Sequence, residues 1–312
     1  MNIIFMGTPE FAVPSLQALI ASTEHTVKAI FTRAPKAQGR GMKLTNSPVH
    51  NIGIANNIIV FTPKSLKNPE VVDCIKNIQA DIIIVVAYGF IIPENILTMK
   101  KYGCLNIHPS SLPKYRGAAP LQRTIINGEK ETSVCVIQMD QGLDTGDIIL
   151  KEALQLNANI TLQELHDKCA NLGSKLLLQA LHNIDILPRV KQSSTNISYA
   201  EKLKKEEGFI DWQDSAWQID CKVRGMTPWP GVYFKYNNKR VKILETSYVN
   251  QPHDLIPGTI INNDCQVACQ QGFLLLKCVK PENKQQMSGA DYLRGIRANN
   301  KNQIILLDDC KN

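Results

Sequence analysis

The sequence predicts an α/β protein in which a doubly wound, mostly parallel sheet is followed by a second, smaller β domain. In the first half, short runs rich in Ile and Val alternate with helix-like segments, as in parallel sheets whose strands are joined by crossover helices. The run DIIIVVA at 81–87 is apolar on both faces, which is typical of a central strand covered on both sides. Short strand-like runs with closely spaced turn signals follow in the second half and favour a small barrel or sandwich.

The individual elements follow from the same patterns. The strands expected in the first half are 3–6, 27–32, 58–61, 82–87, 105–108 and 134–139. The helices between them, several opened by the proline that first helical positions favour, are 14–22, 48–56, 69–77, 93–99 and 118–127. A longer amphipathic helix at 161–183 closes this half. The second half is expected to contain a helix at 212–224 and strands at 231–236, 239–249, 258–261, 266–269 and 273–279.

The length of the chain favours two domains. At 312 residues it is longer than one hydrophobic core usually supports. The stretch 188–208 is polar, serine-rich and charged, which is typical of an inter-domain connection. We therefore predict a first domain at 1–189, a linker at 190–208 and a second domain at 209–312.

Composition narrows the class of protein. The chain is 44% hydrophobic and 20% charged, as in ordinary globular proteins. No apolar run reaches the roughly 18–20 residues of a membrane-spanning helix, and no export signal opens the sequence. The nine cysteines include no CxxC pair and no cluster near a histidine, so we expect a reduced cytoplasmic protein without a metal site. The net charge of +7 permits a polyanionic partner without requiring one.

The first strand invites a dinucleotide-binding interpretation that its turn does not support. The segment IIFMGTPEF runs from strand through glycine to helix. The phosphate-binding fingerprint needs three glycines, whereas this turn has only Gly7, and Pro9 removes a donor N–H. We therefore expect no NAD(P).

Three polar segments follow predicted strands of the first half. They are AYGFIIP at 87–93, NIHPSSLPKYRGAAP at 106–120 and MDQGLDTGD at 139–147. Ligands of doubly wound sheets bind beyond the carboxyl ends of the strands. The sequence therefore predicts that these three segments meet at one rim.

Asn106 and His108 are the first candidates for chemistry. They lie two residues apart in a strand, so their side chains share one face. A satisfied core amide and a buried histidine with one carbonyl partner are the alternative interpretation. An Asn amide can donate to a developing oxyanion at any pH, and a His can exchange a proton near neutrality.

A carboxylate beside that histidine is expected from the 139–147 segment. Of its three aspartates, Asp144 is the best candidate because Gly142 and Gly146 let the loop fold over a ligand, although a turn or cap role is the alternative. The segment PSSLP lacks the glycine elbow of a serine nucleophile. An Asn, a His and an Asp without a nucleophile suit direct group transfer through a tetrahedral intermediate.

Five segments carry a family resemblance: MGTPEFAVPSL, NIHPSSLPKYRGAAPLQR, QMDQGLDTGDI, VRGMTPWPGVYF and MSGADYLRG. In this order they resemble the methionyl-tRNA formyltransferase family of folate-dependent formyltransferases. The resemblance implies a formyltransferase-type, Rossmann-like catalytic domain and an OB-like, tRNA-binding second domain; we expect a monomer, although the sequence does not determine the oligomeric state. It implies transfer of a formyl group from 10-formyltetrahydrofolate to the α-amine of methionyl-initiator-tRNA for translation initiation. An amino-sugar nucleotide acceptor, or hydrolysis of the formyl folate, stays open because the central motifs are shared by those enzymes.

The resemblance also implies roles for individual residues. Asn106, His108 and Asp144 match catalytic positions of the family, and the folate-binding segment matches Ser110, Ser111, Leu112 and Pro113. The family usually has Leu where Ser111 stands, and its loss would lower folate affinity by about 1–3 kcal/mol if that Leu packs on the folate. If the family uses mainly its backbone there, Ser111 changes nothing.

The basic segment RAPKAQGRGMKL at 33–44 is the expected tRNA contact. By composition alone it reads as a flexible, solvated basic loop. The resemblance implies that it engages the acceptor end of tRNA, with Arg40 at the key position and Lys43 adding phosphate attraction. Trp229, between two prolines, is expected in the core, with a base-stacking platform as the alternative.

Overall fold

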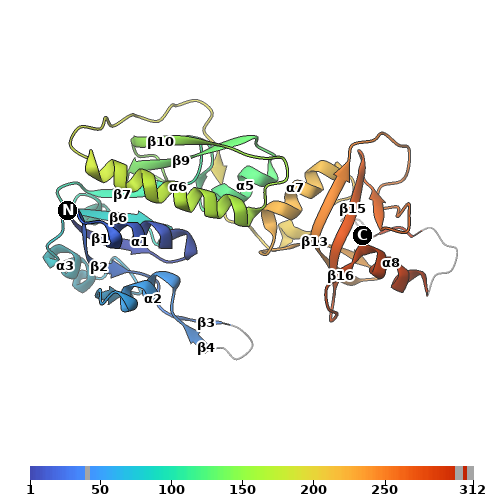
Figure 1. Ribbon diagram of the computed structural model, residues 1–312, viewed down its shortest axis with the longest axis horizontal. Coiled ribbons are helices and arrows are strands. Elements are labelled where there is room, and N and C mark those ends of the chain that lie inside the picture. Colours follow the sequence, from blue (N-terminus) through green and yellow to red (C-terminus); the bar gives the residue numbers. More distant parts are fainter. Residues whose placement is uncertain (39–42, 299–304, 308–312) are drawn as a thin grey trace. The chain divides into compact units, whose positions relative to one another are not determined.

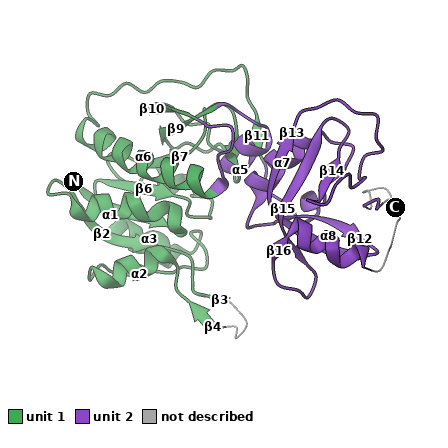
Figure 2. Cartoon of the chain, turned by 45° about the vertical axis from the view of Figure 1, so that its right-hand side comes forward, with its two compact units in different colours: residues 1–120, 131–155, 163–200 green, residues 121–130, 156–162, 201–312 purple. Residues whose placement is uncertain are grey.

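The computed structural model describes residues 1–38, 43–298 and 305–307. The chain forms two compact units, coloured separately in Figure 2. Unit 1 comprises residues 1–120, 131–155 and 163–200, and unit 2 comprises residues 121–130, 156–162 and 201–312. This division places 190–200 of the predicted linker in unit 1 and 201–208 in unit 2. Within the described ranges, no helix is both long and apolar enough to cross a bilayer.

Unit 1 is built on a seven-stranded sheet in the order β10-β9-β7-β6-β1-β2-β5. The pairs among β7, β6, β1, β2 and β5 are parallel, whereas β9 pairs antiparallel with both β7 and β10. The strands are β1 (Asn2–Gly7), β2 (Thr26–Phe31), β5 (Val60–Phe61), β6 (Ile82–Val86), β7 (Cys104–His108), β9 (Glu131–Gln138) and β10 (Ile148–Gln155). The predicted doubly wound, mostly parallel sheet is confirmed.

Helices cover both faces of this sheet. They are α1 (Val13–Ala21), preceded by the short helix η1 (Glu10–Ala12), α2 (Pro48–Ala55), α3 (Pro69–Asn77), α4 (Glu94–Leu97) and α6 (Leu162–His182). Helices α3 and α4 contribute Ile75 and Ile96 to a core cluster with Val85 of β6. Figure 1 shows α1 and α6 side by side, and the rings of Phe11 in η1 and His166 in α6 lie 5.4 Å apart. Proline at the first turn and a capping Ser47 or Asn68 start α2 and α3, as the sequence pattern predicts.

Two small sheets accompany the main sheet of unit 1. The antiparallel pair β3 (Lys36–Gln38) and β4 (Lys43–Thr45) forms largely within the basic segment 33–44, where the composition had suggested a loop. The parallel pair β8 (Arg116–Gly117) and β11 (Tyr199–Ala200) joins the middle of the predicted linker to the segment after β7. Neither pair was expected, because strands of two or three residues leave no periodic signal.

Unit 2 is an antiparallel sheet with helices. Its strand order is β12-β13-β15-β14, with β16 paired to β15. The strands are β12 (Val232–Tyr236), β13 (Lys239–Val249), β14 (Gln266–Ala268), β15 (Phe273–Pro281) and β16 (Met287–Ser288), and the helices are α5 (Pro120–Ile126), η2 (Glu206–Gly208), α7 (Ala216–Met226) and α8 (Gly289–Arg297). Its largest fully buried side chain is Trp212.

Two expectations for the second half were wrong. Residues 258–261 form isolated bridges rather than a strand, Thr259 with Leu306 and Ile260 with Val267. Trp229, expected in the core, is 49% exposed in the turn between α7 and β12. Trp212 fills the core instead, because it packs against Phe234 of β12 with ring centroids 5.7 Å apart.

Candidate active site

Strand β7 places Asn106 and His108 on one face of the sheet. Ile107 between them faces α6, where Gly173 leaves room: a Cβ at Gly173 would lie 2.7 Å from Cγ2 of Ile107. Because side chains alternate along a strand, Asn106 and His108 face the other side, toward the cluster that contains α3 and α4. His108 is 4% exposed, so its ring is held inside the protein.

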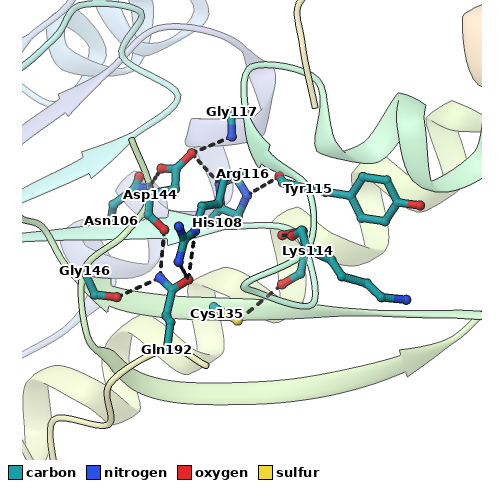
Figure 3. A network of polar contacts seen from close by, with 11 residues as sticks. Asn106, His108, Lys114, Tyr115, Arg116, Gly117, Cys135, Asp144, Gly146 and Gln192 are labelled. Carbon is teal, nitrogen blue, oxygen red and sulfur yellow. Dashed lines mark hydrogen bonds and ion pairs between the residues drawn. The ribbon is translucent and has the colours of Figure 1, made fainter. Parts of the chain in front are cut away.

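Asp144 meets both side chains (Figure 3). Its Oδ1 lies 3.4 Å from the Asn106 amide nitrogen, and its Oδ2 lies 3.5 Å from Nδ1 of His108. The main-chain N–H of Gly117 donates to the same Oδ2 at 2.8 Å. The structure therefore brings the three predicted candidates together around one carboxylate.

Both ring nitrogens of His108 lie beside an oxygen atom. Nε2 lies 2.9 Å from the carbonyl oxygen of Tyr115, which only accepts, so Nε2 carries a hydrogen. Nδ1 faces the carboxylate of Asp144, which is also an acceptor when ionised. Both ring nitrogens therefore lie beside acceptors, and the Nδ1 edge of the ring is the one that faces Asp144.

The loop that carries Asp144 reaches the site by an unexpected route. We predicted that it would follow a parallel strand to the same rim, but β9 runs antiparallel to β7, with Leu105 opposite Gln138 and His108 opposite Cys135. The loop therefore starts at the end of β7 remote from His108 and folds back. Asp140 stabilises that fold, since its Oδ1 accepts from the Gly142 N–H at 3.0 Å and the Thr145 hydroxyl at 2.6 Å.

Two residues around Asp144 escaped the sequence analysis. The amide nitrogen of Gln192 donates to the carbonyls of Asp144 and Gly146 at 2.7 and 2.8 Å. Its oxygen accepts from Nε and Nη2 of Arg116 at 3.1 and 2.7 Å. Arg116 stands in the motif NIHPSSLPKYRG, which is a usable signal, whereas Gln192 lies in a polar stretch that gives none.

The predicted folate segment forms the turn after β7, with its side chains largely engaged. The buried Ser110 hydroxyl donates to the Lys114 carbonyl at 2.7 Å, and the Ser111 hydroxyl lies 2.9 Å from that of Ser133. Leu112 is 2% exposed and belongs to a small core cluster, and the half-buried Pro113 follows a cis peptide bond. This turn leads directly to Tyr115, whose carbonyl holds His108.

Loop 87–93, after the neighbouring strand β6, is anchored from two sides. The Thr8 hydroxyl donates to the Tyr88 carbonyl at 2.9 Å, and Arg33 donates to the Gly89 carbonyl at 3.1 Å while lying 3.9 Å from the centre of the Phe90 ring. The next residue, Ile91, is 91% exposed. Leu143, beside Asp144 in the chain, is 60% exposed. Two loops near the site therefore present free apolar side chains.

The predicted tRNA contacts can be placed only in part. Arg40 lies outside the described residues, and Lys43 is the first residue of β4, opposite Gln38. In the described part of the chain, no three His, Cys, Asp or Glu side chains are grouped so that they could hold a metal ion. Cys265 and Cys269 are core thiols of unit 2, and burial raises the pKa of each to about 12.

Comparison with known proteins identifies the family. Residues 1–181 match the formyl transferase family model, and residues 202–297 match the model of the formyl transferase C-terminal domain. The methionyl-tRNA formyltransferase of Rickettsia bellii is 58% identical over 297 residues, which cover 95% of this chain and 97% of the relative. That of Rickettsia prowazekii is 56% identical over 295 residues, with the same coverage.

Solved structures share the fold. The sugar 3N-formyl transferase WlaRD, determined with dTDP and 5-N-formyl-THF, aligns with a TM-score of 0.66 and 21% identity over 91% of this chain and 99% of its own. A methionyl-tRNA formyltransferase from Clostridium thermocellum aligns with a TM-score of 0.59 and 22% identity over 81% of this chain and 95% of its own. Family models, close relatives and fold agree: the chain belongs to the formyltransferase family and, within it, to the methionyl-tRNA formyltransferases.

Proposed function

We propose that this protein transfers the formyl group of 10-formyltetrahydrofolate to the α-amine of methionine on initiator tRNA. The observation that carries the proposal is the contact of Asn106, His108 and Asp144, within 3.4–3.5 Å of one another through the Asp144 carboxylate. An amide donor, an imidazole and a carboxylate, without a protein nucleophile, suit transfer of an acyl group between two substrates.

The roles of the three side chains follow from their donors and acceptors. The formyl donor supplies a carbon that the methionyl amine attacks; a C–N bond forms, the bond to the folate nitrogen breaks, and the proton lost by the amine ends on that nitrogen. Asn106 has a second amide hydrogen with which to stabilise the oxyanion that develops on the formyl oxygen. Both ring nitrogens of His108 lie beside acceptors, the Tyr115 carbonyl and the Asp144 carboxylate, so His108 acts by moving the proton and not by donating to the oxyanion. Asp144 stabilises the protonated ring.

The residues around the site fit a folate. A pterin ring has apolar faces and hydrogen-bonding edges, and the site loops offer the exposed Ile91 and Leu143 together with main-chain polar groups. We assign the turn Ser110, Ser111, Leu112 and Pro113 to folate binding through its main chain, because the Ser110 and Leu112 side chains are buried. Ser111 in place of the family's usual Leu then costs little affinity. No metal and no NAD(P) enters this proposal.

We assign tRNA binding to the segment 33–44, which includes Arg40 and Lys43 in the sequence, and to unit 2. The outer face of the unit 2 sheet carries four exposed cations, which we call the basic face: Lys235, Arg240, Lys242 and Lys280. Lys242 lies opposite Lys280, and Lys235 lies opposite Arg240. Like charges directly opposite each other destabilise a sheet, so these pairs suggest a polyanionic partner.

Aromatic rings lie within the basic face. The Arg240 guanidinium lies 3.3 Å from the centre of the Tyr233 ring, and the Phe209 ring lies 5.2 Å from that of Tyr233. Cations interleaved with rings are typical of surfaces that bind RNA. Glu282 is close by, and its carboxylate accepts from the main-chain N–H of Arg240 at 3.4 Å rather than from the guanidinium. Arg240 therefore keeps its charge available to phosphate.

The proposal is tested by the choice of acceptor. Purified protein is incubated with 10-formyltetrahydrofolate and charged initiator tRNA, charged elongator tRNA, an amino-sugar nucleotide, or no acceptor. We expect N-formylmethionyl-tRNA from the initiator alone. Formylation of the sugar, or release of formate without an acceptor, would replace the proposal with one of the two alternatives. Sedimentation of the same preparation tests the expected monomer, and fractionation of cells tests the expected cytoplasmic location.

A further inference from the structure

We propose that Arg116 and Gln192 are positioning residues that hold the Asp144 loop against His108. The inference rests on the proposed function, because it assigns a role in that reaction. Neither residue touches Asn106 or His108 through its side chain in the contacts of Figure 3. They act on the carboxylate through the main chain that carries it.

The loop 139–147, which carries Asp144, has a backbone conformation that contacts from outside the loop must stabilise. Asp144 has φ of +53°, a left-handed conformation that is unfavourable for a residue with a side chain. Two residues on, Gly146 passes so close to β9 that a Cβ there would lie 1.7 Å from the Gln138 carbonyl oxygen. A loop in such an unfavourable conformation is stable only where contacts with neighbouring groups hold it in place.

Gln192 supplies that hold with one amide group. Its nitrogen donates to the carbonyls on both sides of Thr145, those of Asp144 and Gly146. The amide cannot be turned round, because the two carbonyls require a donor and the guanidinium of Arg116 requires an acceptor. The position of Gln192 is itself fixed, since Val190 exchanges two main-chain hydrogen bonds with Ile148, at 2.8 and 2.9 Å.

Arg116 is a buried cation that no ordinary ion pair explains. It is 7% exposed, and within the described residues no carboxylate lies within ion-pair distance of it. Burying a charge without a counterion is costly, so the hydrogen bonds of the guanidinium must compensate for its lost hydration. The Gln192 oxygen accepts two of its N–H groups, which fixes the amide that holds the loop.

The same short strand closes the arrangement into a ring. Arg116 lies between Tyr115, whose carbonyl accepts from His108, and Gly117, whose N–H donates to the Asp144 carboxylate. Strand β8 is held in turn by β11, and the Arg116 N–H donates to the Ser198 carbonyl at 3.0 Å. The ring runs from the Asp144 carboxylate through Gly117, Arg116 and Gln192 back to the Asp144 carbonyl. Asp144 is therefore held both at its side-chain carboxylate and at its main-chain carbonyl.

The substitution Gln192→Glu separates positioning from stability. A glutamate keeps the acceptor for Arg116 and gains an ion pair with it, so the melting temperature should hold or rise. It cannot donate to the two carbonyls and repels them, so the loop is released. We expect kcat for the formylated acceptor to fall about 100-fold, with both KM values within about threefold of wild type, as for a misplacement of roughly 1 Å.

Gln138→Glu is the matched control. The Gln138 amide nitrogen also lies near two carbonyls in unit 1, those of Tyr102 and Cys104 at 3.3 and 3.0 Å, but its side chain does not touch the three candidates. We expect its kcat to stay within about twofold of wild type. Two outcomes would overturn the positioning role. One is an equal loss of kcat in both variants, and the other is a lower melting temperature in Gln192→Glu that accounts for its loss of kcat.

Hydrogen exchange tests the same inference without any acceptor. Gln192→Glu should speed amide exchange in residues 142–146 at least about tenfold, and Gln138→Glu, whose main chain borders Gly146 but is not altered, should speed it far less. Unchanged exchange in Gln192→Glu would overturn the proposal whatever the protein formylates. Failure of wild type to formylate methionyl-tRNA would overturn the proposed function alone, since exchange reports the loop directly.

Discussion

The charged groups of unit 1 and unit 2 are arranged in opposite ways. In the site of unit 1, His108, Asp144 and Arg116 are at least partly buried, and each hydrogen-bonds to a defined atom. On the basic face of unit 2, Lys242 and Lys280 are exposed and lie opposite each other. Directional contacts hold reacting groups in place, whereas diffuse charge attracts a large anion. The difference supports our proposals that the chemistry takes place in unit 1 and that unit 2 attracts the tRNA.

A pair of glycines gives the largest expected contrast. A Cβ at Gly146 would lie 1.7 Å from a main-chain oxygen in unit 1, and one at Gly289 would lie 1.9 Å from a main-chain oxygen in unit 2. Each alanine variant should lose about 1–3 kcal/mol of unfolding free energy. Only Gly146→Ala should also lower kcat, by about 100-fold, since it shifts the Asp144 loop. Denaturant unfolding and kcat per folded molecule are the measurements, and similar kcat values for the two variants would remove the contrast.

A charge reversal on the basic face should improve stability and weaken tRNA binding. Lys242→Glu turns a like-charge pair with Lys280 into an opposite-charge pair, a gain of about 0.2–1 kcal/mol. It should raise KM for tRNA several-fold while leaving KM for the folate unchanged, and should lower the salt slope of tRNA binding by about one.

Lys175→Glu on α6 is the control for that variant, because it makes the same change in net charge at an exposed position of unit 1. We expect it to leave KM for tRNA near the wild-type value. If the two variants raise KM equally, net charge alone governs binding and the basic face is not the tRNA site.

The smallest expected effect concerns an ion pair within unit 2. Nη1 of Arg123 lies 2.6 Å from Oε2 of Glu207, and this hydrogen bond is the main cause that lowers the pKa of Glu207 below its ordinary 4.5. A carboxyl group whose pKa is lowered on folding stabilises the fold at pH values above its ordinary pKa. This stabilisation is lost as the pH falls through the pKa of the folded state. Arg123→Met should therefore cost up to about 1 kcal/mol at neutral pH, since the pair is partly exposed.

Unfolding of the wild type and Arg123→Met across acid pH checks this prediction. The difference in unfolding free energy between them should shrink as pH falls below 4.5. A difference that stays constant through this range would show that packing by the arginine stem, and not its charge, makes the contribution.

Much of unit 1 could be predicted because its strands carry strong patterns. The fully buried run at 82–86 and the proline-initiated helices at 48–55 and 69–77 lie within a residue of their expected bounds. The direction of β9 could not be predicted, since residue composition does not distinguish a parallel from an antiparallel strand at the side of a sheet. The sharing of one face by Asn106 and His108 followed from the two-residue period of strands.

The residues that support the site were harder to predict from the sequence. Gln192 lies 48 residues beyond Asp144, in a segment whose polarity resembles a linker, and the contact depends on a single bridge between Ile148 and Val190. Asp144 was found through its flanking glycines, although Gly146 serves close packing against β9. In unit 2, Trp229 was misplaced because composition favours burial of tryptophan, while Trp212 already occupies the core.

The central claim is tested most directly by a double-mutant cycle between His108 and Asp144. The single-turnover rate of formyl transfer to charged initiator tRNA is measured at saturating substrates for wild type, His108→Asn, Asp144→Asn and the double variant. If one hydrogen-bonded unit performs the chemistry, each single change should lower the rate about 10²–10⁴-fold, and the double variant should be little worse than the slower single variant. Losses that multiply in the double variant, or an Asp144→Asn rate near that of wild type, would contradict the account.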